Sequence, residues 1–78
     1  MKEVKIFLGS IDKVKSFVNE ISKYSCDFDL ISGRYVIDAK SIMGIFSLNL
    51  SKPITLDIQA SDEEADEIIA KLTDYIAE

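Results

Sequence analysis

The chain contains no histidine, only one cysteine and no long uninterrupted apolar run. Without imidazole, it lacks the usual general acid–base group and a common nitrogen ligand for metals. The single cysteine, Cys26, has no partner for an intramolecular disulfide or a zinc site, so we interpret it as a small buried hydrophobe. No stretch approaches the roughly 18 apolar residues of a membrane-spanning helix, and the N-terminus has no signal-like apolar segment. We therefore expect no metal, no cofactor and a cytoplasmic location.

The composition predicts one small folded domain, residues 1–78. Hydrophobic residues make up 47% of the chain and charged residues 29%, which suits one packed core and excludes a disordered chain. The net charge of −5 opposes binding to phosphate backbones and to anionic membranes. We expect no nucleic acid and no membrane among its partners, and we favour basic proteins.

Hydrophobic periodicity in the first half predicts a strand, a helix and a hairpin. Residues Glu3–Leu8 alternate as in a strand with one buried side. Apolar residues then recur at three-and-four spacing, which predicts a helix over Ile11–Lys23. Segments 27–32 and 35–39 alternate again around a Ser-Gly turn, as two strands of a hairpin do.

The second half predicts a short helix, a fourth strand and a last helix. The segment Ser41–Leu50 is too apolar for a solvated loop and too short for a long helix. A strand follows over Ile54–Gln59, directly after a proline that is tolerated at a strand start. Ser61 and Glu64 have the spacing of a capping box, and the apolar stripe of the helix that they open runs to Ile76. The predicted fold is α+β, with a layer of helices on one face of a sheet.

The run Lys40–Leu48, Lys-Ser-Ile-Met-Gly-Ile-Phe-Ser-Leu, resembles the regulatory segment of the HPr phosphocarrier family, where Lys-Ser-Ile-Met-Gly opens the short second helix. Segment 60–70 resembles the start of that family's final helix, and the order of elements agrees over nearly the whole chain. The resemblance implies an HPr-like open-faced β-sandwich, with a four-stranded antiparallel sheet and three helices on one face (βαββαβα).

The chain departs from the family at the loop that carries the phosphoacceptor. The family has Gly-Ile-His-Ala-Arg-Pro there, whereas this chain has Gly-Ser-Ile-Asp-Lys-Val, so that Ser10 falls at or near the place of the lost histidine. A serine phosphate is a stable ester and a poor relay. Asp12 stands where the family has its arginine and would repel a phosphoryl group. We expect no histidine phosphocarrier activity.

The resemblance also implies a regulatory site at Ser41, which matches the serine that HPr kinase phosphorylates in HPr and in Crh-type members. A helix start offers free N–H groups that would bind a phosphate, and Lys40 would add a charge contact. The alternative is that Ser41 is only an N-cap.

The apolar residues after this serine have two interpretations as well. A cluster on a short helix is more often core than interface, but the family docks its partners on this surface. We predict that Lys40, Ile42, Met43 and Phe46 bind a partner, with Met43 and Phe46 exposed.

Three functional hypotheses follow. The first is an HPr-like regulatory, protein-binding module of the sugar phosphotransferase (carbon catabolite) system, switched by phosphorylation of Ser41. Its partners would be an HPr kinase-like kinase and a transcriptional regulator or other phosphotransferase-related protein. The alternative is a degenerate HPr-fold domain that acts as a constitutive interaction protein. An enzyme is disfavoured, because there is no metal-ligand cluster or glycine-rich phosphate loop and the acidic residues 62–64 suit the helix that they open.

Overall fold

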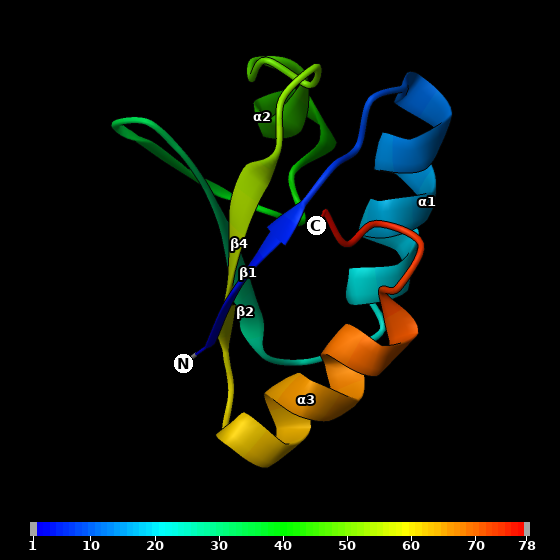
Figure 1. Cartoon of the computed structure of the whole chain (residues 1–78), viewed down its shortest axis with the longest axis vertical. Coiled ribbons are helices and arrows are strands. Elements are labelled where there is room, and N and C mark those ends of the chain that lie inside the picture. Colours follow the sequence, from blue (N-terminus) through cyan, green and yellow to red (C-terminus); the bar gives the residue numbers. More distant parts are fainter. Residues whose placement is uncertain (1, 78) are drawn as a thin grey trace.

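The structure is a computed structural model that describes residues 2–77, and its elements follow the order that the sequence predicts (Figure 1). They are β1 (Lys2–Ile6), α1 (Ile11–Ile21), β2 (Asp27–Ser32), β3 (Tyr35–Asp38), α2 (Ile42–Phe46), β4 (Ile54–Gln59) and α3 (Asp62–Lys71). The four strands form one antiparallel sheet in the order β1-β4-β2-β3. Helices α1 and α3 lie along the same side of the sheet, and α2 lies at one end of it. The predicted α+β fold is confirmed.

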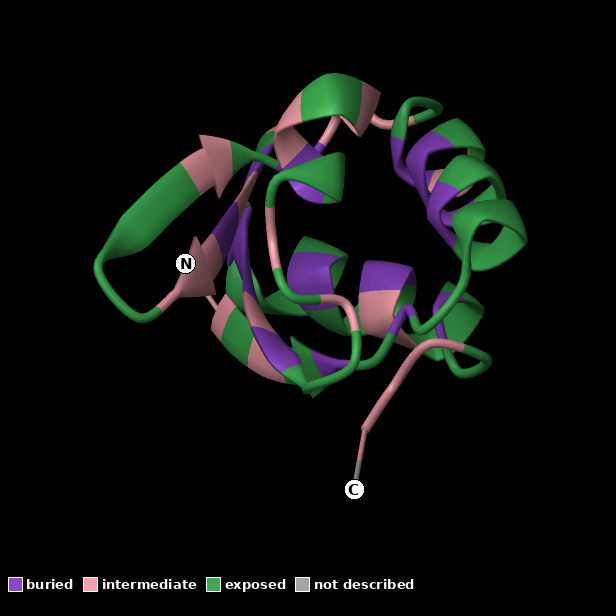
Figure 2. Ribbon diagram, turned by 90° about the horizontal axis from the view of Figure 1, so that it is seen from above, coloured by how far each residue is buried: buried purple, intermediate pink, exposed green. Residues whose placement is uncertain are grey.

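The core lies between the sheet and its helices. Alternate strand residues point inward, so that Leu30 of β2 is paired with Leu56 of β4, which is in turn paired with Val4 of β1. In Figure 2 the buried segments of the helices and of the sheet face the same interior. The largest fully buried side chains are Phe17, Phe28, Ile6, Leu8, Ile21, Leu30, Ile45, Ile54, Leu56, Ile58, Ile68 and Leu72. Burying one such side chain contributes about 1.5–3 kcal/mol.

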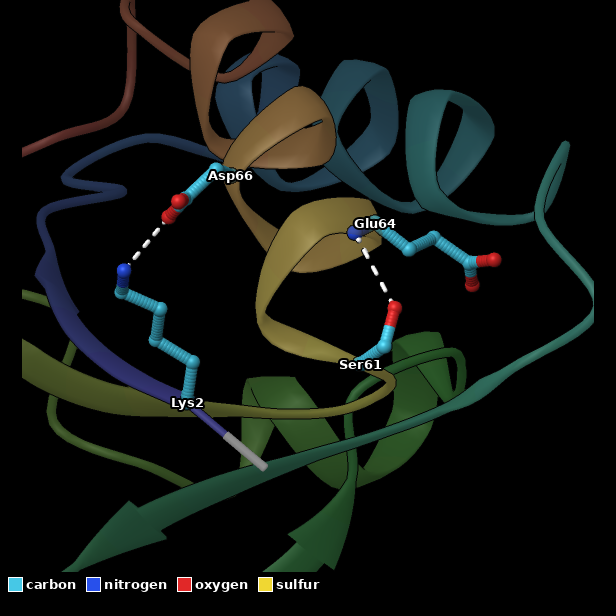
Figure 3. A network of polar contacts seen from close by, with 4 residues as sticks. All are labelled: Lys2, Ser61, Glu64 and Asp66. Carbon is cyan, nitrogen blue, oxygen red and sulfur yellow. Dashed lines mark hydrogen bonds and ion pairs between the residues drawn. The ribbon is translucent and has the colours of Figure 1, made fainter.

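The hairpin and the last helix begin as their sequence signals predict. Gly33 adopts a positive φ of 61° at the first turn position, as a two-residue hairpin turn requires. At α3, Ser61 Oγ accepts a hydrogen bond from the backbone N–H of Glu64 at 3.2 Å (Figure 3). An ion pair between Lys2 and Asp66 joins β1 to the same helix, and the hydrogen bond from Lys2 to this carboxylate raises the pKa of the lysine.

Several element ends differ from the prediction. β1 ends at Ile6, because the next backbone N–H, of Phe7, donates to Tyr75 O at 2.7 Å instead of to a strand. α1 ends at Ile21 and α2 at Phe46, where Ser22 and Ser47 form the C-caps. Tertiary contacts, which periodicity does not report, decide these ends.

The helical stripe predicted to run to Ile76 was wrong at its end. Leu72 leaves helical geometry with φ −107° and ψ 20°, and it closes α3. Ile76 instead forms an isolated antiparallel bridge with Ile6 at the edge of β1. Apolar residues at helical spacing thus continue past the helix, because the following turn brings the chain back to the same core.

Lys40 joins the segment between β3 and α2 to the segment between α1 and β2. Its ammonium donates to Tyr24 O at 2.8 Å and to Cys26 O at 3.0 Å, both in the link between α1 and β2. It also lies 5.5 Å from the centre of the Phe28 ring. Because Lys40 directly precedes Ser41, the N-cap of α2, these contacts tie the start of that helix to the link that leads into β2.

The other face of the sheet has no helix and carries a row of carboxylates. Residues opposite one another across all four strands are Glu3, Asp57, Asp29 and Asp38, one from each strand in sheet order. Cross-strand partners share a face and like charges directly opposite each other are destabilising. We call these four residues the acidic row. Its central member, Asp57, is only 7% exposed.

We expect Lys40→Met to destabilise the protein by about 1–3 kcal/mol, because two partly buried carbonyls lose a charged donor. The melting temperature should fall by roughly 5–15 °C for a domain of this size. Urea unfolding measures the change, with Lys15→Met, an exposed lysine on α1, as the matched control. Equal stability of the two variants would contradict the fastening role of Lys40.

Asp57→Asn should raise stability by about 0.5–1 kcal/mol at neutral pH, because it removes a negative charge placed directly between two others. Asp27→Asn is the matched control, since Asp27 lies on the same face but opposite a glutamine. Chemical denaturation of both variants tests the expectation. A loss of stability in Asp57→Asn alone would mean that the carboxylate is needed by the fold.

Candidate functional site

The loop between β1 and α1 places Ser10 at the start of the first helix. Gly9 has φ +66°, a left-handed conformation that favours glycine, and a Cβ there would lie 2.7 Å from Cε2 of the Phe7 ring. This turn brings the N–H of Ser10 to Leu8 O at 2.7 Å. Ser10 is then the N-cap of α1, and its Oγ accepts from the N–H of Lys13 at 3.2 Å. The Ser10 hydroxyl therefore caps a helix, and its correspondence to the family's histidine stays a prediction.

The first turns of α1 are bound to the chain's C-terminal segment. The ammonium of Lys13 donates to Asp74 O at 2.9 Å and lies 5.7 Å from the centre of the Tyr75 ring. Ser16 Oγ and the Tyr75 hydroxyl are 2.7 Å apart. Asp12 adds a negative charge in the first turn, where the helix dipole favours it. The helix that follows the loop thus carries the Asp12 carboxylate in its first turn, and the nearby Lys13 ammonium is already hydrogen-bonded to Asp74 O.

Ser41 is the N-cap of α2. Its Oγ accepts a hydrogen bond from the N–H of Gly44 at 3.1 Å, and its carbonyl accepts from the N–H of Ile45 at 3.0 Å. A Cβ on Gly44 would lie 3.2 Å from the same Oγ, so glycine leaves room for the hydroxyl. The side chain is half-buried. Ser41 is therefore an N-cap, whereas its phosphorylation, and the alternative that it is only a cap, stay predictions.

The apolar residues of α2 divide between core and surface. Ile45 is fully buried and Ile42 is half-buried against the core, whereas Met43 is 80% exposed and Phe46 39% exposed. The predicted exposure of Met43 and Phe46 is confirmed. Their contact with a partner stays a prediction, as does that of Ile42.

A shallow depression of about 560 Å³ lies between α1 and α2. It is lined by Asp12, Lys15, Ser16, Val18, Asn19, Ser22 and Ile42. The N-terminus of α1 and the whole of α2 lie at the same end of the molecule (Figure 1). We call the depression, with the exposed residues Met43 and Phe46, the α1–α2 surface. An open, shallow depression of mixed polar and apolar lining suits protein docking better than the enclosure of a small substrate.

Sequence reasoning missed Ile11, which is 60% exposed at the start of α1. Its spacing from Val14 suits the buried stripe, so periodicity assigns it to the core. The first helical turn extends beyond the sheet, and only the structure reveals this. Ile11 is an additional exposed apolar residue beside Ser10.

Lys40 and Cys26, which the sequence analysis also singled out, both make contacts within the fold. The ammonium of Lys40 is bound by the two carbonyls described above, so its contact with a phosphate or a partner stays a prediction.

Cys26 is half-buried against the core. Burial, and then the nearby Glu64 carboxylate, raise the pKa of its thiol. Such a thiol is protonated at neutral pH and is a poor nucleophile.

No helix within residues 2–77 is long and apolar enough to span a bilayer.

Known proteins share both the sequence and this architecture. The chain is 34% identical over 62 residues to the HPr-like protein Crh of Bacillus subtilis (strain 168), a match that covers 80% of this chain and 73% of Crh. The phosphocarrier protein HPr of Bacillus anthracis str. Ames superimposes with a TM-score of 0.74 at 30% identity, over 97% of this chain and 94% of that one. HPr-C-His of Thermoanaerobacter tengcongensis gives a TM-score of 0.73 at 32% identity, over 92% and 90% of the two chains.

The family model agrees with these relatives. The model, described as PTS HPr component phosphorylation site, matches residues 13–78, a range that includes Ser41 and begins beyond Ser10. The match thus covers most of α1 and every later element. On the strength of this match and of the shared fold, the chain belongs to the PTS HPr family.

Proposed function

We propose that this protein is a regulatory, protein-binding module of the sugar phosphotransferase (carbon catabolite) system. It has no histidine phosphocarrier activity, and phosphorylation of Ser41 switches its affinity for a partner. The observation that carries this proposal is the arrangement of α2, in which the N-cap serine lies two residues before the most exposed apolar side chain, Met43.

The chemistry of the Ser10 loop supports the loss of the relay. A phosphoryl relay needs a nucleophile whose adduct transfers readily, and imidazole is absent from this chain. Ser10 Oγ is engaged as an N-cap, the Asp12 carboxylate lies in the adjoining turn, and the Lys13 ammonium there already donates to Asp74 O. A negative charge there destabilises a dianionic phosphoryl group.

A phosphate on Ser41 would change the surface that partners meet. It would add nearly two negative charges and three acceptor oxygens at the first turn of α2, where backbone N–H groups lack helical partners. The existing bond from the Gly44 N–H to Ser41 Oγ would compete with these oxygens. Because Met43 and Phe46 are on the same short helix, such a change acts directly on the exposed apolar side chains.

The partners in this proposal are proteins. A kinase of the HPr kinase type would modify Ser41, and a transcriptional regulator or another phosphotransferase-related protein would bind the α1–α2 surface. Lys40 and Ile42 flank the serine and would contribute to these contacts. We assign the protein a cytoplasmic location and no catalytic step of its own.

A second function is favoured by the state of the Ser41 hydroxyl. The hydroxyl is half-buried and already accepts a bond from the Gly44 N–H, which suits a purely structural cap. In that case the protein is a constitutive interaction domain whose α1–α2 surface binds its partner without modification.

Incubation with an HPr kinase and ATP should add one phosphate to the protein, measured as intact mass. Ser41→Ala should abolish the addition. Ser47→Ala is the matched control, because Ser47 caps the other end of the same helix and its loss should leave the phosphate in place. If the native chain gains no phosphate, the switch is ruled out and the constitutive domain remains.

Met43→Gln should raise the KM of the kinase about tenfold, because an apolar anchor is replaced by a polar side chain of similar length. Stability should change by less than about 0.5 kcal/mol, since Met43 packs little against the core. The control is Val36→Thr, which changes an exposed apolar residue on the hairpin. A KM that Met43→Gln does not change would exclude Met43 from the docking surface.

A further inference from the structure

The acidic row lies on the face of the sheet that α1 and α3 leave open. It runs across all four strands, from Glu3 through Asp57 and Asp29 to Asp38. Neighbouring strands are about 4.8 Å apart, so the row is about 14 Å long. Two of its members have a neutral partner, since Gln59 Nε2 donates to Asp29 Oδ2 at 2.6 Å and the N–H of Lys40 donates to Asp38 Oδ1 at 2.9 Å.

Asp57, one of the two inner members of the row, has a buried oxygen without a hydrogen-bond partner among the described residues. Asp57 is only 7% exposed, and its Oδ1 has no hydrogen-bond partner among residues 2–77. The carboxylate of Glu3, directly opposite, also has no ion pair or hydrogen bond within that range. An unpaired buried carboxylate is costly. A position that breaks the local rules of stability is where a ligand is expected to supply the missing partner.

The next row along the strands limits what that ligand can be. It consists of Lys5, Thr55, Ile31 and Val36, in the same strand order and on the same face. Its apolar end, Ile31 and Val36, is suited to the aliphatic stems of lysine or arginine, which pack on apolar surface while their charged heads stay polar. Within residues 2–77, no group of three or more acidic or thiol side chains is placed to hold a metal ion. An organic cation fits better than a metal.

We infer that the open face of the sheet binds an extended basic segment of another protein, with arginine or lysine at alternate positions. Side chains at alternate positions of an extended chain are about 6.6 Å apart, so three of them span about 13 Å, close to the length of the acidic row. The central cation would lie between Asp57 and Asp29, and an end cation would lie at Glu3, where arginine can bond both oxygens of a carboxylate. This surface is separate from α2, so the inference does not depend on the proposed switch.

The test uses the peptide acetyl-Arg-Thr-Arg-Thr-Arg-amide, titrated into the ¹⁵N-labelled full chain at low ionic strength. We expect saturable amide shifts concentrated at positions 3, 29 and 57. The double variant Glu3→Gln/Asp57→Asn should weaken binding about tenfold, since it removes the two unpaired carboxylates. Glu63→Gln/Glu67→Gln is the matched control, because it changes the net charge equally on exposed positions of α3 and should leave affinity unchanged within about twofold.

Four outcomes would overturn the inference. The first is the absence of saturable shifts in the acidic row at millimolar peptide. The second is an equal loss of affinity in the control variant, which would mean that net charge alone attracts the peptide. The third is equal affinity for acetyl-Arg-Arg-Arg-Thr-Thr-amide, which would remove the spacing argument. The last is a saturable response of the same amides to calcium chloride alone, which would make the row a metal site.

Discussion

The insertion of β4 between β1 and β2 is the constraint on which the rest of the structure depends. β4 is the last strand among the described residues but an inner strand of the sheet, and it pairs over residues 54–58 with β1 and over residues 55–59 with β2. Its inward residues Ile54, Leu56 and Ile58 are almost wholly buried and belong to the core. Without β4, β1 has no strand partner and the hairpin β2–β3 stands alone, which is marginal in water.

This topology has a kinetic consequence. The pairing of Lys2 with Ile58 and of Ile6 with Ile54 joins residues from opposite ends of the chain. The chain loses loop-closure entropy before such contacts can stabilise the fold. Folding is therefore slower than it is with local pairings. The C-terminal segment adds to the same dependence, because Ile76 bridges to Ile6 at the edge of β1. The strand pairing of β1 is therefore made with the second half of the chain.

Periodicity and capping signals in the sequence were sufficient to predict the seven elements and their order. Ser61 opens α3 and Gly33 turns the hairpin for local reasons that short sequence spacings report directly. The ends were less predictable: Ile76 keeps helical spacing but lies in a bridge, and Ile11 suits the buried stripe but is exposed. Both depend on where one element stops relative to another, which is a tertiary property.

The sites were predictable to different degrees for the same reason. The exposure of Met43 and Phe46 follows from an apolar density that a five-residue helix cannot bury in full. The binding of Lys40 to two distant carbonyls has no local signal, because its partners are at positions 24 and 26. The acidic row was hidden as well: Asp57 reads as the polar face of an alternating strand, and only the strand order places carboxylates on both sides of it.

The small size of α2 explains how one serine can govern a docking surface. A helix this short does not persist in water on its own. It is held by one fully buried side chain, Ile45, and by its end caps, of which the bond from the Gly44 N–H to Ser41 Oγ is the first. Any group attached to that oxygen must rearrange this bond, and the positions of Met43 and Phe46 depend on the same turn. The hydroxyl that stabilises the helix is thus the point from which its exposed apolar side chains can be moved.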